Sequence, residues 1–487
     1  MSGPVSRTTE DEFIVASAAV AAALESGAVY ADARVVRNRR ERIGVLDDGV
    51  SEMVEQNDEG ISVRALVGSS WGFQGSAGTS IAAAERAGRS AYQAAAAGTA
   101  LPGPAFSLLD TEVNVAEWTS PRAIEPWDVT ADQKTDLLLT AAETMLQHGA
   151  DRAEADYTAV ATDKWLVSSE GHRIFQSTLD TSASITATVQ NGGESQRRSY
   201  PGFTAGCASG GWEHVLGLDL IANAARVADE AQALARAPLC PSGDFDLILS
   251  GHQMAMQIHE TVAHAIEIDR ILGWEAGLAG TSWLELPQIG RTVFGSRLMN
   301  ITIDPTIPGA PGGYRYDDEG TTASRQAVVH EGIWVGALAS RDTAVLAGLQ
   351  QAGNTRGVSW QGLPMVRISS VGIDPGPHET EELIAETKHG ILIDANRAWS
   401  VDDRRLNFQF GGEFAWEIKN GRRTRMVRNP AYGGTAPTFW RSLDMLSRES
   451  QVVGLEGCGK GQPAQVATVS HRVSPARFRG VEIGAST

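Results

Sequence analysis

Two histidines and one glutamate stand close together at residues 259–264, within the segment 258–270, which reads IHETVAHAIEIDR. Glu260 follows His259 directly, and His264 comes five residues after His259. Many zinc peptidases carry H-E-x-x-H on a helix, where the two imidazoles bind the metal and the glutamate acts as general base. The pattern here is one residue longer, H-E-x-x-x-H, so its geometry decides whether the same chemistry is available.

The spacing of the two histidines allows two interpretations. On a regular α-helix each residue advances about 100°, so a pair four apart is offset by about 40° and a pair five apart by about 140°. The wider offset is too large for a shared metal, and His259 and His264 would then be unrelated helical histidines. Alternatively, a one-residue π-bulge between them brings both imidazoles to one side, and such bulges are frequent at functional sites.

A catalytic zinc needs a third protein ligand besides the two histidines. By spacing along the same predicted helix, His252 and Glu267 are candidates. Cys458 is another, in the glycine-rich segment GCGKGQ. We expect an exposed loop there, with Lys460 favouring the thiolate form that binds metals. The alternative is a loop cysteine without a role.

Two groups of acidic residues, one just after the motif and one at 317–319, have two explanations each. Glu267 and Asp269 can orient an imidazole from outside the ligand set, or they can belong to a solvated or salt-bridged helix face. Asp317, Asp318 and Glu319 can line a cavity or bind a peptide amine, but an acidic surface turn is the commoner explanation.

The helices and strands that must hold these residues follow one pattern in the first half of the chain and another in the second half. Residues 1–240 alternate helical and strand patterns, with helices predicted at 11–27, 80–97, 130–149 and 216–236. A segment with Pro and Gly at 237–243 marks a boundary, so we predict an N-terminal domain at 1–240 and a C-terminal domain at 241–487. The second begins with a strand at 245–249 and a helix from about 252 to 272, and it continues mainly as strands. The predicted fold class is α+β, with an N-terminal helix/strand domain and a β-rich C-terminal domain carrying the metal-binding helix.

The N-terminal pattern partly recurs. YADARVV at 30–36 is echoed by EADYTAV at 154–160, and GISVRALVGS at 60–69 by ASITATVQNG at 183–192. Either an internal duplication or two sheet segments of similar alternation explains the echo, since aligned identities are few. We also predict strands at 31–36 and 40–46 and a hairpin at 60–73. A further prediction is that exposed backbone at 60–69 or near 327–338 pairs with an extended peptide substrate.

Composition limits the classes of partner. The 487 residues include 41 Lys+Arg and 59 Asp+Glu, and the net charge of −18 disfavours nucleic acid and anionic membranes. The apolar run from Phe13 to Leu24 is too short to span a bilayer and has no basic leader. The three cysteines indicate a reducing cytoplasm, with Cys207 and Cys240 outside any metal site.

Taken together, the motifs resemble those of the TldD/PmbA family of zinc-dependent peptidases over nearly the whole chain. The resemblance rests on DEGISVRALVGSSWGFQGS at 58–76, HETVAHAIEIDR at 259–270 and GCGKGQ at 457–462. Shorter matches follow in the family's order: AGTSWL at 279–284, YDDEGT at 316–321, AGNTRG at 352–357 and PGPHETEELI at 375–384. Departures are Ala263, where the family often has Gly, Thr355, where a second Gly is usual, and a segment after Lys460 that is one residue shorter.

The resemblance implies a role for each residue of the motif. His259 and His264 match the family's zinc-binding histidines, Cys458 its third ligand and Glu260 its general base. It also implies one Zn²⁺ per chain and the metal-bearing TldD type, which pairs as a homodimer or with a metal-free paralogue. Such dimers enclose the site in a chamber and act on short or unfolded peptides.

The sequence therefore predicts a cytoplasmic zinc metallopeptidase. Two alternatives stay open. One is a TldD-like metalloenzyme redirected to processing a peptide-derived metabolite, and the other is a non-catalytic dimer partner. The intact set of His259, Glu260, His264 and Cys458 disfavours the second.

Overall fold

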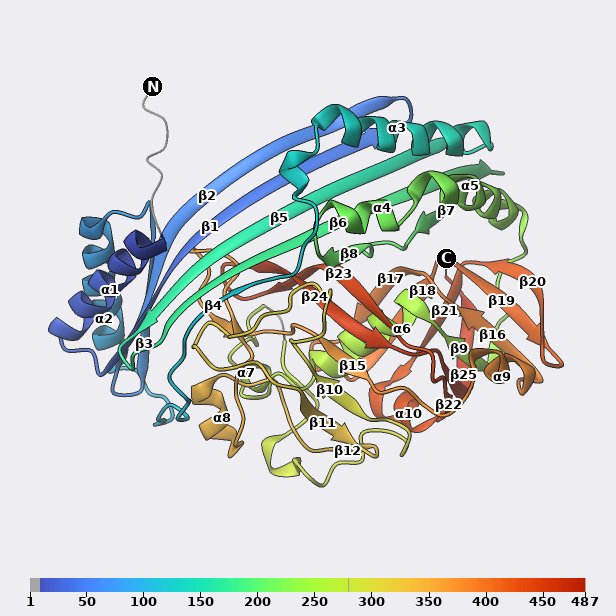
Figure 1. The fold of residues 1–487 in the computed structure, drawn as a ribbon. Helices are drawn as coiled ribbons and strands as arrows, with labels where there is room; N and C mark the ends of the chain where they lie inside the picture. Colours follow the sequence, from blue (N-terminus) through green and yellow to red (C-terminus); the bar gives the residue numbers. More distant parts are fainter. Residues whose placement is uncertain (1–8, 279, 487) are drawn as a thin grey trace.

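Four long antiparallel strands form an arched sheet over the rest of the molecule (Figure 1). The computed structural model describes residues 9–278 and 280–486. The long strands lie side by side in the order β2 (Gly49–Val67), β1 (Tyr30–Leu46), β5 (Arg152–Ser168) and β6 (Arg173–Asn191). Shorter strands extend the sheet: β3 (Ser70–Ala77) on β2, and β4 (Val115–Thr119), β7 (Glu194–Tyr200) and β8 (Cys207–Ser209) on β6.

Alternation along the strands gives this sheet one apolar and one polar face. Odd-numbered side chains such as Val35 and Ile185 are buried beneath helices. Helices α1 (Thr9–Glu25) and α2 (Ile81–Gly98) cover one end of that face, and α3 (Ala131–Gln147) and α5 (Leu220–Arg236) cover the other, with α4 (Trp212–Gly217) beside α5 (Figure 1). Even-numbered side chains, among them Asn38, Thr162 and Thr178, are polar and face the C-terminal half. The predicted helices are thus confirmed, although the last one is split into α4 and α5.

The order of elements in the first part of the chain recurs in the second. Residues 9–98 run α1-β1-β2-β3-α2, and residues 131–236 run α3-β5-β6-β7-α5, with β8 and α4 inserted before α5. The echo in the sequence thus corresponds to a repeated arrangement of elements. The predicted hairpin is confirmed as β2–β3, with Val67 opposite Ser70. The two strands predicted at 31–36 and 40–46 are one continuous strand, β1.

The C-terminal half is built around a nine-stranded sheet within the described residues. Its main path is β17 (Asn396–Val401), β18 (Asn407–Gly412), β21 (Pro430–Thr435), β25 (Ala476–Ala485), β9 (Gly243–Leu249), β16 (His389–Ile393), β19 (Phe414–Lys419) and β20 (Arg422–Arg428). β22 (Leu443–Leu446) pairs with β25, helix α9 (Thr380–Ala385) contacts β20 and β22, and α10 (Ala436–Arg441) contacts β21 and β25. The α+β class with a β-rich C-terminal half is confirmed.

A hairpin of β23 (Gln451–Lys460) and β24 (Gln465–Val473) lies between the arched sheet and helix α6 (Gly251–Ile258) (Figure 1). Beside it are a small sheet and a short ladder. The sheet has the order β12 (Ile333–Trp334), β11 (Gln326–His330), β10 (Ile301–Ile303) and β15 (Val371–Ile373), and the ladder joins β13 (Thr355–Arg356) to β14 (Met365–Val366). Outside the segment that follows α6, the remaining elements are η1 (Pro126–Asp128), η3 (Leu286–Gln288) and α8 (Arg341–Ala347).

Neither segment predicted to pair with a peptide has a free edge. β2 is bonded to β1 on one side and to β3 on the other. β11 lies between β10 and β12, and the outer side of β12 is bonded to residues 292–293. Residues 327–338 are also not one strand, because Gly332 turns the chain back at φ +77° between β11 and β12. The prediction of peptide pairing at these two places is therefore wrong.

The acidic run after residue 316 is buried, so the predicted surface turn is wrong. Asp318 pairs with Arg34 at 2.7 Å and with Lys164 at 2.6 Å, and both cations come from the arched sheet. Glu319 pairs with Arg64 in the same way, at 3.2 Å. Burial alone raises the pKa of Asp318, but Lys164 and Arg34 outweigh it and lower the pKa to about 2. The run therefore ties the C-terminal half to the polar face of the arched sheet.

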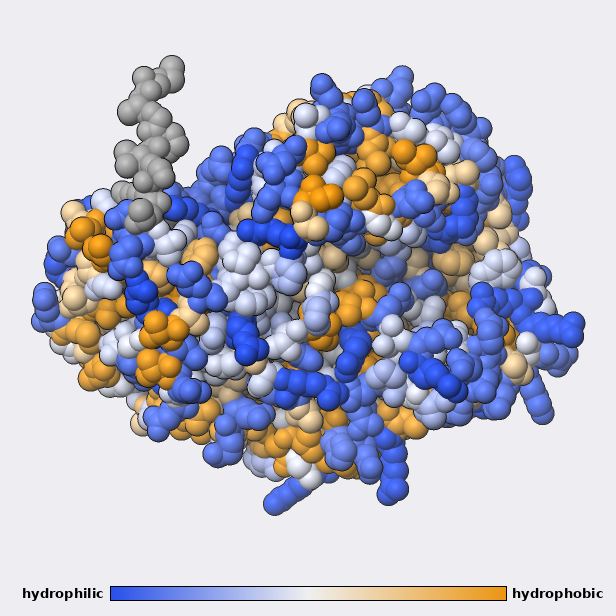
Figure 2. Space-filling model, viewed as in Figure 1, coloured by the Kyte–Doolittle hydropathy of each residue, from blue (hydrophilic) through white to orange (hydrophobic). Residues whose placement is uncertain are grey.

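The visible face of the molecule is mainly hydrophilic, with hydrophobic residues in scattered groups (Figure 2). This distribution follows from helices that turn their apolar sides towards the sheet. Among the described residues, no helix is both long and apolar enough to cross a membrane.

Candidate metal centre

The helix that carries the motif changes form at the motif itself. Helix α6 ends at Ile258, and residues His259–Ala263 form a π-helical turn, η2. The backbone N–H of His264 donates to the carbonyl oxygen of His259 at 3.2 Å, which is a bond over five residues. The extra residue in this turn brings both imidazoles to the same side, with ring centroids 4.6 Å apart.

The π-bulge interpretation of the spacing is therefore confirmed, and the two histidines are not unrelated. A continuous helix to residue 272 was also expected, and that prediction is wrong. The chain leaves the helix after His264, forms a bridge from Glu267 to Leu338, and only then makes the short helix α7 (Ile268–Ile271).

A potential ligand atom of His259, one of His264 and the Sγ of Cys458 lie within 4.8 Å of one another. All three side chains are buried. The Sγ of Cys458 is 3.7 Å from Nε2 of His264. Bond lengths of about 2.3 Å to sulfur and 2.0–2.1 Å to nitrogen at a tetrahedral zinc place such atoms roughly 3.6 Å apart. The three donors therefore fit a metal of this size.

Cys458 reaches the site from strand β23, so the expected exposed loop is wrong. A bulge between Leu455 and Cys458 interrupts the pairing with β24 and accommodates Gly457 at φ +93°. Burial raises the pKa of the Cys458 thiol. A cation bound beside the sulfur would favour the thiolate, because coordinated thiols lose their proton.

His264 is oriented by a buried carboxylate. Its Nδ1 lies 2.9 Å from Oε2 of Glu267, which leaves Nε2 directed towards Cys458. Lys460 lies 3.1 Å from the other oxygen of Glu267 and 2.8 Å from Asp269. The charge of Lys460 is thus paired with these carboxylates, and it also lowers the pKa of the Cys458 thiol as predicted, although burial outweighs this effect. Glu267 orients an imidazole, and Asp269 belongs to the ion-pair network.

His259 is held by another histidine that the sequence did not point to. Nδ1 of His259 is 2.9 Å from Nε2 of His471, and Nδ1 of His471 is 2.7 Å from the carbonyl oxygen of Val371. Burial lowers the pKa of all three imidazoles, to about 3 for His264, to about 4 for His471 and well below the ordinary value for His259. Neutral imidazole is the form that binds metals.

Glu260 lies beside the two histidines and is paired with Arg405 at 2.5 Å. Burial raises the pKa of Glu260, whereas the guanidinium groups of Arg405 and Arg270 lower it. Arg405 has φ +59°, a conformation that non-glycine residues seldom adopt and that clusters at functional sites. The structure therefore adds Arg405 to the residues around the motif.

The other residues considered as ligands lie outside this group. His252 packs against Gly202, where a Cβ would lie 2.2 Å from its Nδ1. Cys207 and Cys240 are buried free thiols, as expected, and neither is grouped with the two histidines.

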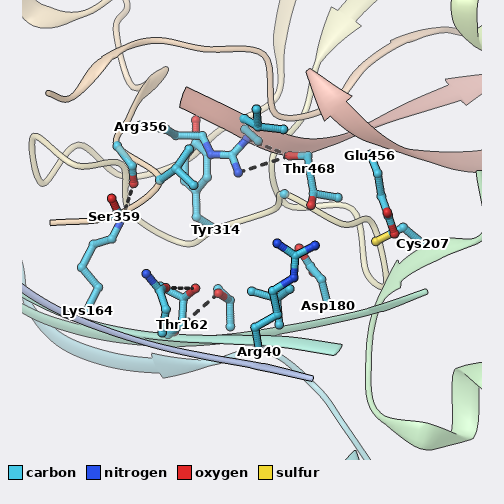
Figure 3. Close-up of a pocket in the computed structure, with 18 of the residues that line it drawn as sticks. Arg40, Thr162, Lys164, Asp180, Cys207, Tyr314, Arg356, Ser359, Glu456 and Thr468 are labelled. Carbon is cyan, nitrogen blue, oxygen red and sulfur yellow. Dashed lines mark hydrogen bonds between the residues drawn. The ribbon is translucent and has the colours of Figure 1, made fainter. Parts of the chain in front are cut away.

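A cavity of about 620 Å³ lies between the arched sheet and the C-terminal half, and residues of both line it (Figure 3). Its floor is the polar face of the arched sheet, with Arg40, Thr162, Lys164 and Asp180, and Arg356 faces them from the C-terminal half. On β24, Val466, Ala467 and Thr468 line this cavity, whereas Val469 and His471 are buried and do not line it. None of the residues His259, His264 and Cys458 lines the cavity, although Gly457 and Ala467, next to and paired with Cys458, do.

Comparison with known proteins covers nearly the whole chain. Models of PmbA/TldA metallopeptidases match as domain 1 at residues 31–95, as the central domain at 124–239 and as the C-terminal domain at 242–485. A metalloprotease of Methanocaldococcus jannaschii is 28% identical over 442 residues, which are 90% of this chain and 94% of that protein. A metalloprotease TldD homolog of Haemophilus influenzae is 26% identical over 447 residues, 86% of this chain and 88% of that protein.

Solved structures show the same fold. TldE from Thermococcus kodakarensis superposes with a TM-score of 0.70 at 15% sequence identity, covering 96% of this chain and 99% of that one. The family models together match more than half of the residues and include the segment with His259, His264 and Cys458. The chain therefore belongs to the TldD/PmbA family, and it is a metallopeptidase.

Proposed function

We propose that the protein is a zinc-dependent peptidase that hydrolyses short or unfolded peptides. The observation that carries the proposal is the convergence of His259, His264 and Cys458 within 4.8 Å, with Glu260 in the same π-helical turn as His259. Two imidazoles and one thiolate favour zinc over the hard cations that prefer oxygen ligands. Three protein ligands also leave a coordination position for substrate or water.

The chemistry that zinc supplies when bound is Lewis acidity, towards the scissile carbonyl and towards the attacking water. Glu260 accepts a proton from that water and delivers it to the leaving amine. Arg405 donates a hydrogen bond to one carboxylate oxygen of Glu260 and so holds the group in place. Glu267 keeps the imidazole of His264 in place during this exchange.

We also propose that the enzyme works in the cytoplasm as a dimer, homomeric or with a metal-free paralogue, whose two chains enclose the site in a chamber. The similarity to TldE supports an assembly of this kind. The three free cysteines are compatible with a reducing compartment. Light scattering of the purified chain, alone and mixed with a candidate paralogue, measures which assembly forms.

Metal analysis combined with Glu260→Gln tests the catalytic proposal. We expect about one zinc per chain in both proteins, because Glu260 is not a ligand. The variant should lose about 10²- to 10⁴-fold in peptide cleavage, which is the usual contribution of a general base. A variant that cleaves unfolded peptides at the parent rate would sink the role of Glu260, and purified protein without a transition metal would sink the whole proposal.

A further inference from the structure

His471 is a buried histidine for which neither the motif nor the proposed reaction gives a role. It lies on β24, on the same face as Ala467, which is paired with Cys458 across the hairpin. The hairpin that supplies the cysteine therefore also supplies His471. Its side chain is 0% exposed and makes two contacts of hydrogen-bond length, one to Val371 and one to His259.

The direction of both hydrogen bonds follows from the partners. The carbonyl oxygen of Val371 can only accept, so Nδ1 of His471 carries a proton and donates it. Among the described residues, no carboxylate is hydrogen-bonded to His471, so a buried imidazolium there would have no counter-ion. His471 is therefore neutral, and its Nε2 offers a lone pair.

That lone pair determines the tautomer of His259. Nε2 of His471 accepts at 2.9 Å, so Nδ1 of His259 must be the protonated nitrogen. A neutral imidazole has one N–H, which leaves Nε2 of His259 unprotonated. Only an unprotonated nitrogen binds a metal, and histidine ligands usually donate their other N–H to an acceptor that fixes them.

We propose that His471 is a positioning residue that makes His259 a metal ligand, by holding its ring and its tautomer through the chain Val371–His471–His259. The inference rests on the proposed zinc site. The two histidine ligands are thus oriented differently, His264 by the carboxylate of Glu267 and His259 by a neutral imidazole. A neutral acceptor adds no further negative charge to a buried site that already holds Glu260, Glu267 and a thiolate.

Two amide variants separate the two hydrogen bonds of His471. In histidine, Nδ1 lies two bonds from Cβ and Nε2 three bonds along the other side of the ring. The side-chain amide of asparagine reaches the first position and that of glutamine the second. His471→Gln therefore keeps an acceptor for His259, whereas His471→Asn keeps only the contact with Val371.

Zinc affinity, measured by competition with a chromophoric chelator, tests the proposal in the full chain. We expect His471→Asn and His471→Leu to bind Zn²⁺ about 10- to 100-fold more weakly and His471→Gln to stay within about 3-fold of the parent. The control His172→Gln, at a buried histidine that accepts from the backbone of Asn114, should bind zinc like the parent. Thermal unfolding of the metal-free proteins shows whether each variant folds.

The outcomes separate the inference from the proposed function. If the parent binds zinc and all His471 variants bind it equally well, His471 has no positioning role, while the zinc site stands. If the parent binds no zinc, both fail.

A measurement on the parent protein covers the case in which the variants do not fold. Long-range ¹H–¹⁵N spectra of the zinc-loaded, histidine-labelled chain should show His259 protonated at Nδ1 and ligated through Nε2. Ligation through Nδ1 would overturn the inference.

Discussion

At the scale of single residues, the site depends on groups that act on the motif from distant parts of the chain. His259, Glu260 and His264 stand out in the sequence by type and spacing, and the resemblance to the TldD/PmbA family selects Cys458 among three candidate third ligands. Arg405 and His471 do not stand out, since an arginine after a strand and a histidine within one match no motif. Both are more than 140 residues from the groups they touch, as only the fold could show.

Arg405 should set the acid limb of the pH–rate profile through Glu260. A general base must be ionised, and Arg405 lowers a pKa that burial has raised. Arg405→Gln should therefore raise the pKa of Glu260 and move the acid limb of kcat/KM to higher pH. At pH values below the raised pKa, activity should fall by about tenfold or more relative to the parent. Arg405→Lys keeps the charge and should shift the limb less. An unchanged limb in Arg405→Gln would show that the ion pair does not act on the base.

At the scale of elements, periodicity predicted most helices and strands but not the ones that form the site. The sheet of long strands follows from alternation, because apolar odd-numbered residues meet helices. The glycines around Cys458 predict a loop, yet they belong to a bulged strand. The spacing of His259 and His264 fits either a regular helix with unrelated histidines or a π-turn with both on one side, and the sequence does not distinguish these alternatives.

The position of Cys458 should depend on how closely the β23–β24 hairpin packs against β8. A Cβ on Gly454 would lie 2.1 Å from the carbonyl oxygen of Cys207, whereas one on Gly459 of the same strand meets nothing within 4 Å. Gly454→Ala should therefore lower the free energy of unfolding by about 1–3 kcal/mol and weaken zinc binding, while Gly459→Ala should change neither. Denaturant titration and chelator competition measure the two effects. Equal behaviour of the two variants would contradict this packing argument.

At the scale of the whole molecule, a buried ion cluster joins the two halves. Asp318 from the C-terminal half meets Arg34 and Lys164 of the arched sheet, and all three side chains are largely buried. The sequence showed three consecutive acidic residues but not their partners, which lie 154 and 284 residues away. The division into domains at 1–240 and 241–487 stays a prediction.

Asp318→Asn should destabilise the protein and change its response to acid. Removing one partner leaves buried cations unpaired, which costs about 3–5 kcal/mol, whereas Glu55→Gln in the exposed pair with Arg39 should cost about 0–1 kcal/mol. The pKa of Asp318 is lowered from 3.8 to about 2, so its contribution is fully present above pH 3.8 and is lost as the pH falls towards 2. Denaturant titrations at several pH values should therefore show the free energy of unfolding of the parent falling between pH 3.8 and 2 because Asp318 is protonated. The variant should lack this part of the decrease. Equal losses in the two variants would contradict the account.

The central claim is that His259, His264 and Cys458 bind one zinc ion, and X-ray absorption at the zinc edge tests it most directly. The account predicts one sulfur at about 2.3 Å and nitrogen ligands at about 2.0–2.1 Å, with the sulfur absent in Cys458→Ala. A zinc surrounded only by nitrogen and oxygen in the parent protein would contradict it.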